Sequence, residues 1–519
     1  MKLRHSIHTP TNLMAGRATL CAPGLSGHAS GAHGVARPAL TNRFRGPTRG
    51  ISIRVNLSLN RGAAERGSVL VIVMLIAFGL ISIALYFANS MSLELRASDN
   101  RASGLSADQA IEGAARYVGY ILTAYATNGA VPDLTQYQAE AVPVGNARAP
   151  EQNAHFWIIG RDPSGTASSE PYFSLIDEGS KLNLNTVNSN VLSFLPNMTL
   201  DFAEAITDWR DPNGTMSLNY SQLGYLPKHS PFETVDELRL VYGATVELLA
   251  GDDLNRNGVL DANELDSGGN HAVSPGLLEY ATLYSREPNF HSDGTALTNA
   301  TTRSQLQSLL QSRFGTARAN QIIDRQFPPA APAGGRAGPS APPAPTTTPV
   351  ATNLVDFYVT AGMTSAELGQ IINDITFSSS SYTRGRVNIN TASADVLTAL
   401  FEGIGVDQST AAGAAQQLVN YREQNPNNLT SVAWLVDALG SGSSVVRFLR
   451  RGDYITTRSF QFTADIAATG AYGRGYERVK FVFDISQGTP RIAYRQDLAR
   501  LGWALGGKTR ETWVTQITR

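Results

Sequence analysis

The sequence predicts an α+β protein: a long N-terminal helix packs on an antiparallel sheet, and a large α-helical domain is inserted into that sheet. Three observations lead to this prediction: one long apolar run, strand-like segments near both ends of the chain that follows it, and an internal repeat between those segments. With 519 residues the chain can hold more than one folded unit, because domains typically contain roughly 100–200 residues.

The apolar run, Ser68 to Ala88, holds 21 residues without a charge. At 1.5 Å per residue it spans roughly 30 Å, the thickness of a bilayer core, and it is longer than the apolar region of about 7–15 residues in a removable secretory signal. No proline interrupts Ser92 to Tyr125, where apolar or small residues recur at helical spacing. One continuous helix from residue 68 to about 125 is therefore expected.

Charge is divided unevenly along the chain. Residues 1–67 contain ten Lys or Arg and one acid, which leaves 32 basic and 42 acidic residues, a net charge of −10, for the rest. The basic flank favours a cytoplasmic N-terminal side, with residues 89–519 across the membrane. A net negative surface is poorly suited to nucleic acid or anionic lipid. The single cysteine, Cys21, lies in the basic leader, so the remainder can form no disulfide.

Segments rich in aromatic and β-branched residues predict strands on both sides of a long central region. They cover residues 154–162, 170–185, 459–470, 477–486 and 489–498. Two such segments near the start and three near the end indicate one antiparallel sheet that an insertion interrupts.

The insertion contains a repeat, because KLNLNTVNSNVLSFL at 181–195 matches RVNINTASADVLTAL at 386–400. Each copy continues into two predicted helices, at 203–211 and 234–243 in the first copy and at 414–423 and 431–440 in the second. Asn185-Thr186 and Asn390-Thr391 are the predicted helix N-caps. A proline-rich linker at 328–352 separates the two copies, which together span 181–243 and 386–440.

The basic leader that ends in glycine, followed by an apolar helix, resembles the N-terminus of type IV pilins and type II secretion pseudopilins. The resemblance implies that a prepilin peptidase cuts between Gly67 and Ser68 and that the new N-terminus is methylated. Most members carry Glu at the fifth mature position, where this chain has Ile72. The minor pseudopilin K (general secretion pathway protein K) family lacks that glutamate. The leader is longer than the family pattern.

A physical reason connects Ile72 with a tip subunit. A carboxylate in hydrocarbon costs several kcal/mol unless it is paired, and in a filament its partner is the N-terminal amine of a neighbouring subunit. A subunit with no neighbour above it has no such amine. The inserted domain, with its NxNT repeat followed by DWRD and PFETVDELRLVYG, also resembles pseudopilin K, and the likeness covers most of residues 62–500.

The resemblance implies a pilin-like fold and the following division of the chain. Residues 1–67 form a removed leader, 68–88 the transmembrane part of the helix, 89–180 the periplasmic helix and first strands, 181–440 the inserted domain with a duplicated helix-hairpin-helix-like unit, and 441–519 the C-terminal strands. The expected role is a single-pass subunit of the bacterial inner membrane, with its bulk in the periplasm, that caps or initiates the pseudopilus. Expected partners are other minor pseudopilins, prepilin peptidase and secreted substrates.

A calcium loop is predicted at DLNRNGVLDANE, residues 253–264, which fits the EF-hand pattern at each defining position. The predicted ligands are the side chains of Asp253, Asn255, Asn257, Asp261 and Glu264 and the backbone carbonyl of Val259, with Gly258 at the sharp turn. The residues after the loop do not favour an exit helix, and an Asx-rich surface turn is the alternative. We expect calcium to have a structural role, and pseudopilin K proteins also bind calcium in their helical domain.

The second repeat also resembles a helix-hairpin-helix module, which binds DNA phosphates through glycine amides and nearby Lys or Arg. No Lys or Arg occurs from Val387 to Tyr421, and three acids surround the Gly403-Ile404-Gly405 hairpin. The repeats are therefore expected to be structural, and nucleic acid is not an expected partner. A membrane-anchored DNA-binding competence protein is the main alternative, and an anchored periplasmic calcium module without a filament partner is a third.

Catalysis is not expected from the motifs in the chain. The four histidines beyond the leader form no zinc-binding spacing, and there is no P-loop or G-x-S-x-G motif. Four acids, Asp208, Asp211, Glu233 and Asp236, are expected to cap helices and stabilise hairpins rather than to act as an acid–base pair.

Overall fold

The computed structural model describes residues 65–132, 137–145, 149, 152–162, 168–328 and 348–517. The predicted leader up to residue 64 and residues 329–347 of the predicted proline-rich linker lie outside the described residues. The chain divides into two units, Met1–Leu80 and Ile81–Arg519.

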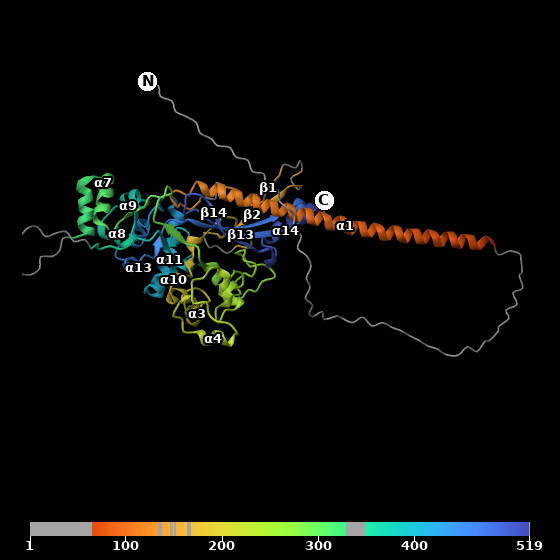
Figure 1. Ribbon diagram of the computed structural model, residues 1–519, viewed down its shortest axis with the longest axis horizontal. Coiled ribbons are helices and arrows are strands. Elements are labelled where there is room, and N and C mark those ends of the chain that lie inside the picture. Colours follow the sequence, from red (N-terminus) through yellow and green to blue (C-terminus); the bar gives the residue numbers. More distant parts are fainter. Residues whose placement is uncertain are drawn as a thin grey trace, which may run out of the picture. The chain divides into compact units, whose positions relative to one another are not determined.

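Helix α1 (Glu65–Thr123) is one continuous helix of 59 residues, which confirms the long N-terminal helix (Figure 1). In the first unit, every large apolar side chain from Val69 to Leu80 is more than half exposed. Among the described residues, one helix is long and apolar enough to cross a membrane, and it is α1. This agrees with a single membrane span, because an apolar surface of this length needs an apolar solvent.

In the second unit, the C-terminal part of α1 packs on a sheet. Its buried face is rich in small residues at spacings of three and four, and consists of Ala107, Ala110, Ile111, Ala114, Ala115, Val118 and Leu122. The alanines let the helix backbone approach the apolar face of the sheet, where Phe462, Phe481 and Phe483 belong to the same core. The packing of a long helix on the sheet confirms this part of the predicted fold.

The sheet is antiparallel throughout. Its strand order is β1 (Val142–Val144), β2 (Ala154–Ile159), β12 (Gln461–Thr469), β13 (Glu477–Asp484) and β14 (Arg491–Asp497), and β3 (Ile176–Asp177) also pairs with β12. Asp465 on β12 lies opposite Ile159 on β2, so strands about 300 residues apart in the chain are neighbours. Because β2 and β3 both pair with β12, the residues between β3 and β12 form an insertion in this sheet.

The insertion has its own core, built mainly from short helices. The helices are α2 (Ser189–Ser193), α3 (Leu200–Arg210), α4 (Ser217–Gln222), η4 (Val235–Leu240), α5 (Val246–Ala250), α6 (Leu277–Tyr280), α7 (Arg303–Gln326), α8 (Leu354–Ala361), α9 (Ser365–Ile371), α10 (Ala394–Gly403), α11 (Gln408–Gln424), α12 (Ala433–Leu439) and α13 (Ser444–Leu449). Helix α13 and strand β11 (Ile455–Thr456) contribute to this core although they follow residue 440. A last helix, α14 (Gly506–Ile517), ends the described chain.

Short strand pairs join the segments of the insertion. Strand β4 (Leu182–Asn183) pairs in parallel with β5 (Ala281–Thr282), and β10 (Val387–Asn388) pairs in parallel with β11. The other pairs are β6 (Arg286–Pro288) with β9 (Tyr382–Arg384) and β7 (Thr298–Asn299) with β8 (Ile375–Thr376). Each repeat therefore begins on a strand whose partner lies after that repeat's helices.

The predicted N-caps at Asn185-Thr186 and Asn390-Thr391 are wrong. Helices α2 and α10 are capped three residues later by Asn188 and Ser393, whose side chains accept the amides of Val191 and Val396 at 2.9 and 3.3 Å.

The two asparagines that were predicted as caps bind more distant residues. Asn185 accepts from the amide of Phe232 at 2.8 Å, and Asn390 accepts from the indole of Trp434 at 2.9 Å. The turn after each strand is thus held by long-range hydrogen bonds, which a local capping pattern does not reveal.

Asp177, at the end of β3, connects the sheet to the second repeat. Its carboxylate is 6% exposed and accepts hydrogen bonds from Asn388 at 2.9 Å, Thr391 at 2.5 Å, Ser459 at 2.7 Å and the amide of Gly179 at 2.7 Å. Burial raises the pKa of Asp177 to about 6, against the lowering effect of these hydrogen bonds.

Glu178 connects the sheet to the end of the first repeat. Its side chain is 2% exposed and accepts from the hydroxyls of Thr282 on β5 and Thr463 on β12, the latter at 2.5 Å. Burial acts to raise the pKa of Glu178, but Lys181, Lys480 and the two threonines hold it below its ordinary value.

We expect Asp177 to make stability depend on pH. Because its folded pKa of about 6 exceeds the unfolded value of 3.8, the folded state binds more protons between these values, and the unfolding free energy falls as pH rises through the window. The slope from this group is at most about 1.4 kcal/mol per pH unit. Chemical denaturation of the detergent-solubilised chain at pH 4 to 7 should show a pH dependence that is shallower in Asp177→Asn than in wild type and in the exposed control Asp324→Asn, by up to this slope.

Gly475 allows the β12–β13 loop to touch α1. It has φ +68°, and a Cβ there would overlap the backbone of Ser103 and Gly104. We expect Gly475→Ala to lower the unfolding free energy by about 2–4 kcal/mol, from left-handed strain together with overpacking. Gly413→Ala, at an open position in α11, should raise it by up to about 1 kcal/mol. Equal denaturation midpoints for the two variants would contradict this close approach.

Candidate metal centre

The predicted calcium loop, residues 253–264, follows α5 in the inserted domain. Its backbone turns at Arg256 with φ 58° and at Gly258 with φ 85°, so the sharp turn lies at the predicted glycine. The side chains at the start of the loop point inward: Asp253, Asn255 and Asn257 are 4%, 5% and 0% exposed.

The loop is wound around its own polar side chains. Asp253 accepts from the amides of Asn257 at 2.9 Å and Gly258 at 2.8 Å, and Asn257 accepts from the amide of Val259 at 3.0 Å. Glu264 closes the loop from its far end, because its two oxygens accept the amides of Asn255 at 3.1 Å and Asp261 at 3.0 Å.

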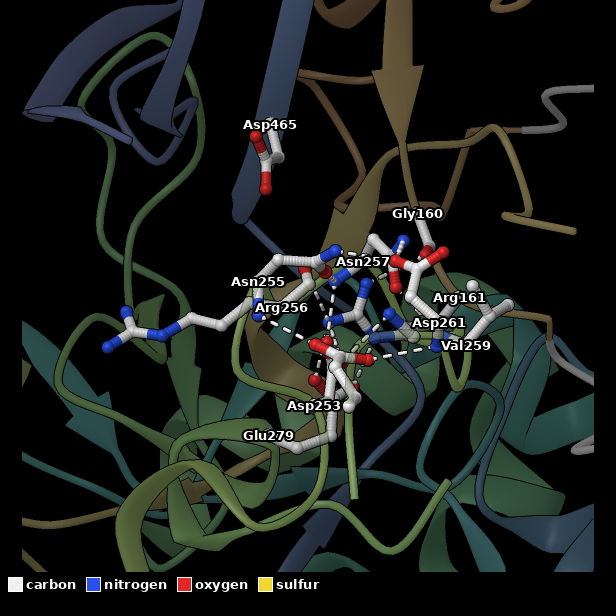
Figure 2. A network of polar contacts seen from close by, with 12 residues as sticks. Gly160, Arg161, Asp253, Asn255, Arg256, Asn257, Val259, Asp261, Glu279 and Asp465 are labelled. Atoms are coloured by element: carbon white, nitrogen blue, oxygen red, sulfur yellow. Dashed lines mark hydrogen bonds and ion pairs between the residues drawn. The ribbon is translucent and has the colours of Figure 1, made fainter. Parts of the chain in front are cut away.

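The structure therefore brings the predicted ligand side chains together (Figure 2). Asp261 lies between the two asparagines and accepts from the amide groups of Asn255 at 2.6 Å and Asn257 at 2.9 Å. Val259, the predicted backbone ligand, is buried and bonded through its amide to Asn257.

The donor set fits calcium, which prefers carboxylate and amide oxygens. Burial raises the pKa of Asp253 to about 6, although Arg161 acts in the opposite direction. Within the described residues, no three His, Cys, Asp or Glu side chains lie close enough together to hold a metal ion. Calcium binding would therefore require the asparagine amides to turn their oxygens inward in place of the hydrogen bonds to Asp261.

Two arginines of the sheet region hold the loop backbone, and local sequence patterns do not reveal them. Arg161, just after β2, donates to both oxygens of Glu279 at 2.8 Å and to the carbonyl of Arg256 at 3.3 Å, and lies 3.9 Å from Asp253. Its neighbours in the chain give no sign of this role, because Glu279 is 118 residues away.

Arg478 on β13 makes the second attachment and is 0% exposed. It pairs with Asp465 on β12 through two bonds of 2.9 and 2.6 Å, and donates to the carbonyls of Asn255 at 2.5 Å and Arg256 at 3.0 Å. The pair is Asp465 and Arg478, charged residues at buried positions of two paired strands, and a buried charge of this kind needs a partner.

The other predicted site residues belong to a different part of the chain. Gly67, Ser68 and Ile72 lie in α1 within the first unit, and Ile72 is 56% exposed. Two of the four acids expected to be structural make local contacts of that kind: Asp208 accepts from the amide of Met216 at 3.3 Å and Asp211 from the amide of Asn213 at 2.9 Å.

We expect Arg478→Met to lower the unfolding free energy by about 3–5 kcal/mol, because it leaves the buried Asp465 carboxylate and the Asn255 carbonyl without their donor. The matched control is Arg495→Met, which breaks an exposed pair with Glu112 at 3.4 Å and should cost less than about 1 kcal/mol. Urea denaturation measures both, and a similar small effect for the two variants would show that the loop is not held by Arg478.

Comparison with known families identifies one segment of this domain. A family model described as type II secretion system (T2SS), protein K matches residues 387–446, from β10 to the first turn of α13. The matched segment contains the second repeat, with Asn388, Asn390 and Arg422. No curated protein matches the chain.

Proposed function

We propose, on the premise that this chain belongs to the type II secretion system protein K family, that it is a minor pseudopilin at the tip of the pseudopilus. The most direct support comes from two features together: the domain that contains the matched segment, and the long helix and sheet to which that domain is attached. The domain is inserted between strands of a sheet on which a 59-residue, N-terminally apolar helix packs.

The helix supplies the assembly surface in this proposal. Its apolar part from Val69 to Leu80 is exposed and would lie in the inner membrane. Beyond it, Met91, Leu95 and Leu105 are about 60% exposed and recur at helical spacing, which suits contact with helices of other minor pseudopilins. Ile72 would suit a subunit with no neighbour above it, because it needs no amine partner.

The inserted domain would act by steric hindrance to further subunits rather than as a catalyst. We infer that its two repeats are structural copies, because equivalent arginines brace equivalent turns: Arg210 donates to the carbonyls of Leu184 and Val187, and Arg422 donates to that of Ala392 at 2.6 Å. A bulky domain above the sheet would prevent addition of a further subunit. The match of residues 387–446 to the protein K family likewise supports a non-enzymatic role.

DNA binding is disfavoured by the electrostatics of the second repeat. The first turn of α11 is capped by Asp407, whose carboxylate accepts the amide of Thr410 at 3.0 Å. The aspartate already takes one of the amides that a phosphate would need, and it repels that phosphate.

Calcium is proposed as a structural cofactor of the loop. When bound it would supply a double positive charge among the loop carboxylates. Asp253, Asp261 and Glu264 would hold it, and the sheet arginines would keep the loop backbone in place.

Processing tests the assignment to this class of protein. In cells with prepilin peptidase, N-terminal sequencing of the mature chain should begin at Ser68, and Gly67→Val should leave the leader attached because the peptidase requires the small residue before its cut. Gly79→Ala, an open position in the same helix, is the control and should be cut normally. A wild-type chain that keeps residues before Ser68 would rule out the pseudopilin assignment.

Calcium removal tests the loop separately. We expect calcium to raise the melting temperature of the purified chain relative to EGTA, and Glu264→Gln to weaken calcium affinity at least about tenfold, because the position-12 carboxylate is lost. Glu247→Gln, on the exposed side of α5, is the matched control and should bind calcium as wild type does. Titration calorimetry measures the affinities, and equal values for all three chains would contradict the predicted ligand set.

A further inference from the structure

A hydrogen bond joins the C-terminal segment of the chain to the predicted calcium loop. The side chain of Asn255 donates from Nδ2 to the backbone carbonyl of Trp503 at 3.1 Å, although the two residues are 248 positions apart. Asn255 is a predicted calcium ligand and is 5% exposed. Trp503 lies between β14 and α14, outside the inserted domain. A predicted ligand of the inserted domain therefore has a partner in the sheet region.

This bond helps to set the orientation of the Asn255 amide. Its Oδ1 accepts from the backbone amide of Asn257 at 3.0 Å, while its Nδ2 donates to Trp503 and, at 2.6 Å, to Asp261. A backbone N–H can only donate and a backbone carbonyl can only accept. The two backbone groups therefore determine which side of the amide carries the oxygen.

Calcium depends on this orientation, because only the oxygen of an amide can bind it. Asp261 is itself a predicted ligand, so its hydrogen bond from Nδ2 would be given up when a cation occupies the loop. The Trp503 carbonyl is outside the ligand set and would remain as the acceptor of Nδ2. Outer hydrogen bonds of this type orient the ligands of metal sites generally.

The other predicted asparagine ligand has no comparable outer acceptor among the described residues. Asn257 is 0% exposed, and its Nδ2 donates to Asp261 at 2.9 Å. Its orientation is thus set within the loop, whereas that of Asn255 also depends on a distant segment. The two asparagines therefore provide an internal comparison.

The sheet holds the Trp503 carbonyl in place. The Trp503 ring packs on Tyr476 with a centroid distance of 5.0 Å, and its Nε1 donates to the carbonyl of Gly506 at 2.8 Å. The next residues, Ala504 and Leu505, are 0% exposed and belong to a small core on the sheet. The position of the acceptor therefore follows from the packing of the C-terminal segment.

We propose that Trp503 is a positioning residue of the calcium loop: its backbone carbonyl holds the Asn255 amide with the oxygen toward the cation. The packing of the C-terminal segment on the sheet then sets the calcium affinity of the inserted domain. The proposal rests on calcium binding by the loop and is independent of a role in secretion. Because coupling between two sites is reciprocal, bound calcium would also stabilise the C-terminal segment.

Calorimetric titration of the full chain with calcium chloride, in detergent, tests the proposal. Trp503→Ala removes the ring that anchors the segment, and we expect its calcium affinity to be about tenfold weaker than that of wild type, as for other outer contacts of metal ligands. Phe448→Ala is the matched control, because it removes a half-buried aromatic ring that lies beside Gly405 of the second repeat. It should bind calcium as wild type does.

Double variants separate positioning from a general loss of stability. Asn255→Asp presents two equivalent oxygens, so its orientation does not matter, and Trp503→Ala should not weaken calcium binding further in that background. In an Asn257→Asp background the loss should persist, because Asn255 is retained. Equal losses in wild type and in both backgrounds would show a general effect on the fold and would overturn the proposal.

A second variant keeps the test decisive if Trp503→Ala does not give a cooperative melting transition in EGTA. Trp503→Phe retains an aromatic ring against Tyr476 and loses the indole donor to Gly506, so we expect a several-fold weaker calcium affinity. Unchanged affinity in the folded Trp503 variants would overturn the positioning role and leave the calcium site standing. Absence of calcium binding by wild type would overturn the calcium site itself and this role with it.

Discussion

The position of the inserted domain on the sheet depends on the hydrogen bonds of two adjacent buried carboxylates, Asp177 and Glu178. They stand where the chain leaves the sheet for the inserted domain, and their hydrogen-bond donors come from β5, the second repeat and β12. An unsatisfied carboxylate at either position would be costly, so both ends of the insertion must return to the same point of the sheet. The insertion is thus positioned by hydrogen bonds to two residues rather than by its apolar core.

The rest of this junction is built on the same principle. Arg478 with Asp465, and Arg161 with Glu279, are charge pairs at the boundary between the two parts, and each arginine also binds loop carbonyls. Such pairs contribute little net stability compared with apolar residues of the same volume, but breaking one leaves a buried charge without its partner. We infer that they determine the register in which the helical domain sits on the sheet. An apolar interface would allow sliding, whereas bidentate pairs do not.

The predicted calcium loop lies within this junction. Its backbone is held by the sheet, while its side chains face one another. The backbone carbonyl of Arg256 accepts from both arginines, so a cation bound in the loop would act on the segment by which the inserted domain is attached to the sheet.

Features that depend on near neighbours could be predicted from the sequence. The long helix follows from an uninterrupted apolar and then amphipathic spacing, and the strands β2, β12, β13 and β14 follow from their aromatic and β-branched residues. The segment 170–185 was predicted as a strand but is broken into β3, a 3₁₀ turn (Glu178–Ser180) and β4. Its apolar content indicates a strand, but Asp177 caps the turn through the amide of Gly179, and both carboxylates accept from side chains more than 100 residues away.

One physical reason separates what the sequence by itself determines from what only the tertiary structure determines. Composition, helical spacing and the twelve-residue loop pattern are properties of residues close in sequence, and they were enough to indicate the membrane helix, the interrupted sheet and the place of the loop. The contacts of the sheet arginines Arg161 and Arg478 with the loop and Glu279 could not be found in this way. Each depends on pairing across 100 to 300 residues, and only the closed tertiary structure decides which buried charge meets which partner.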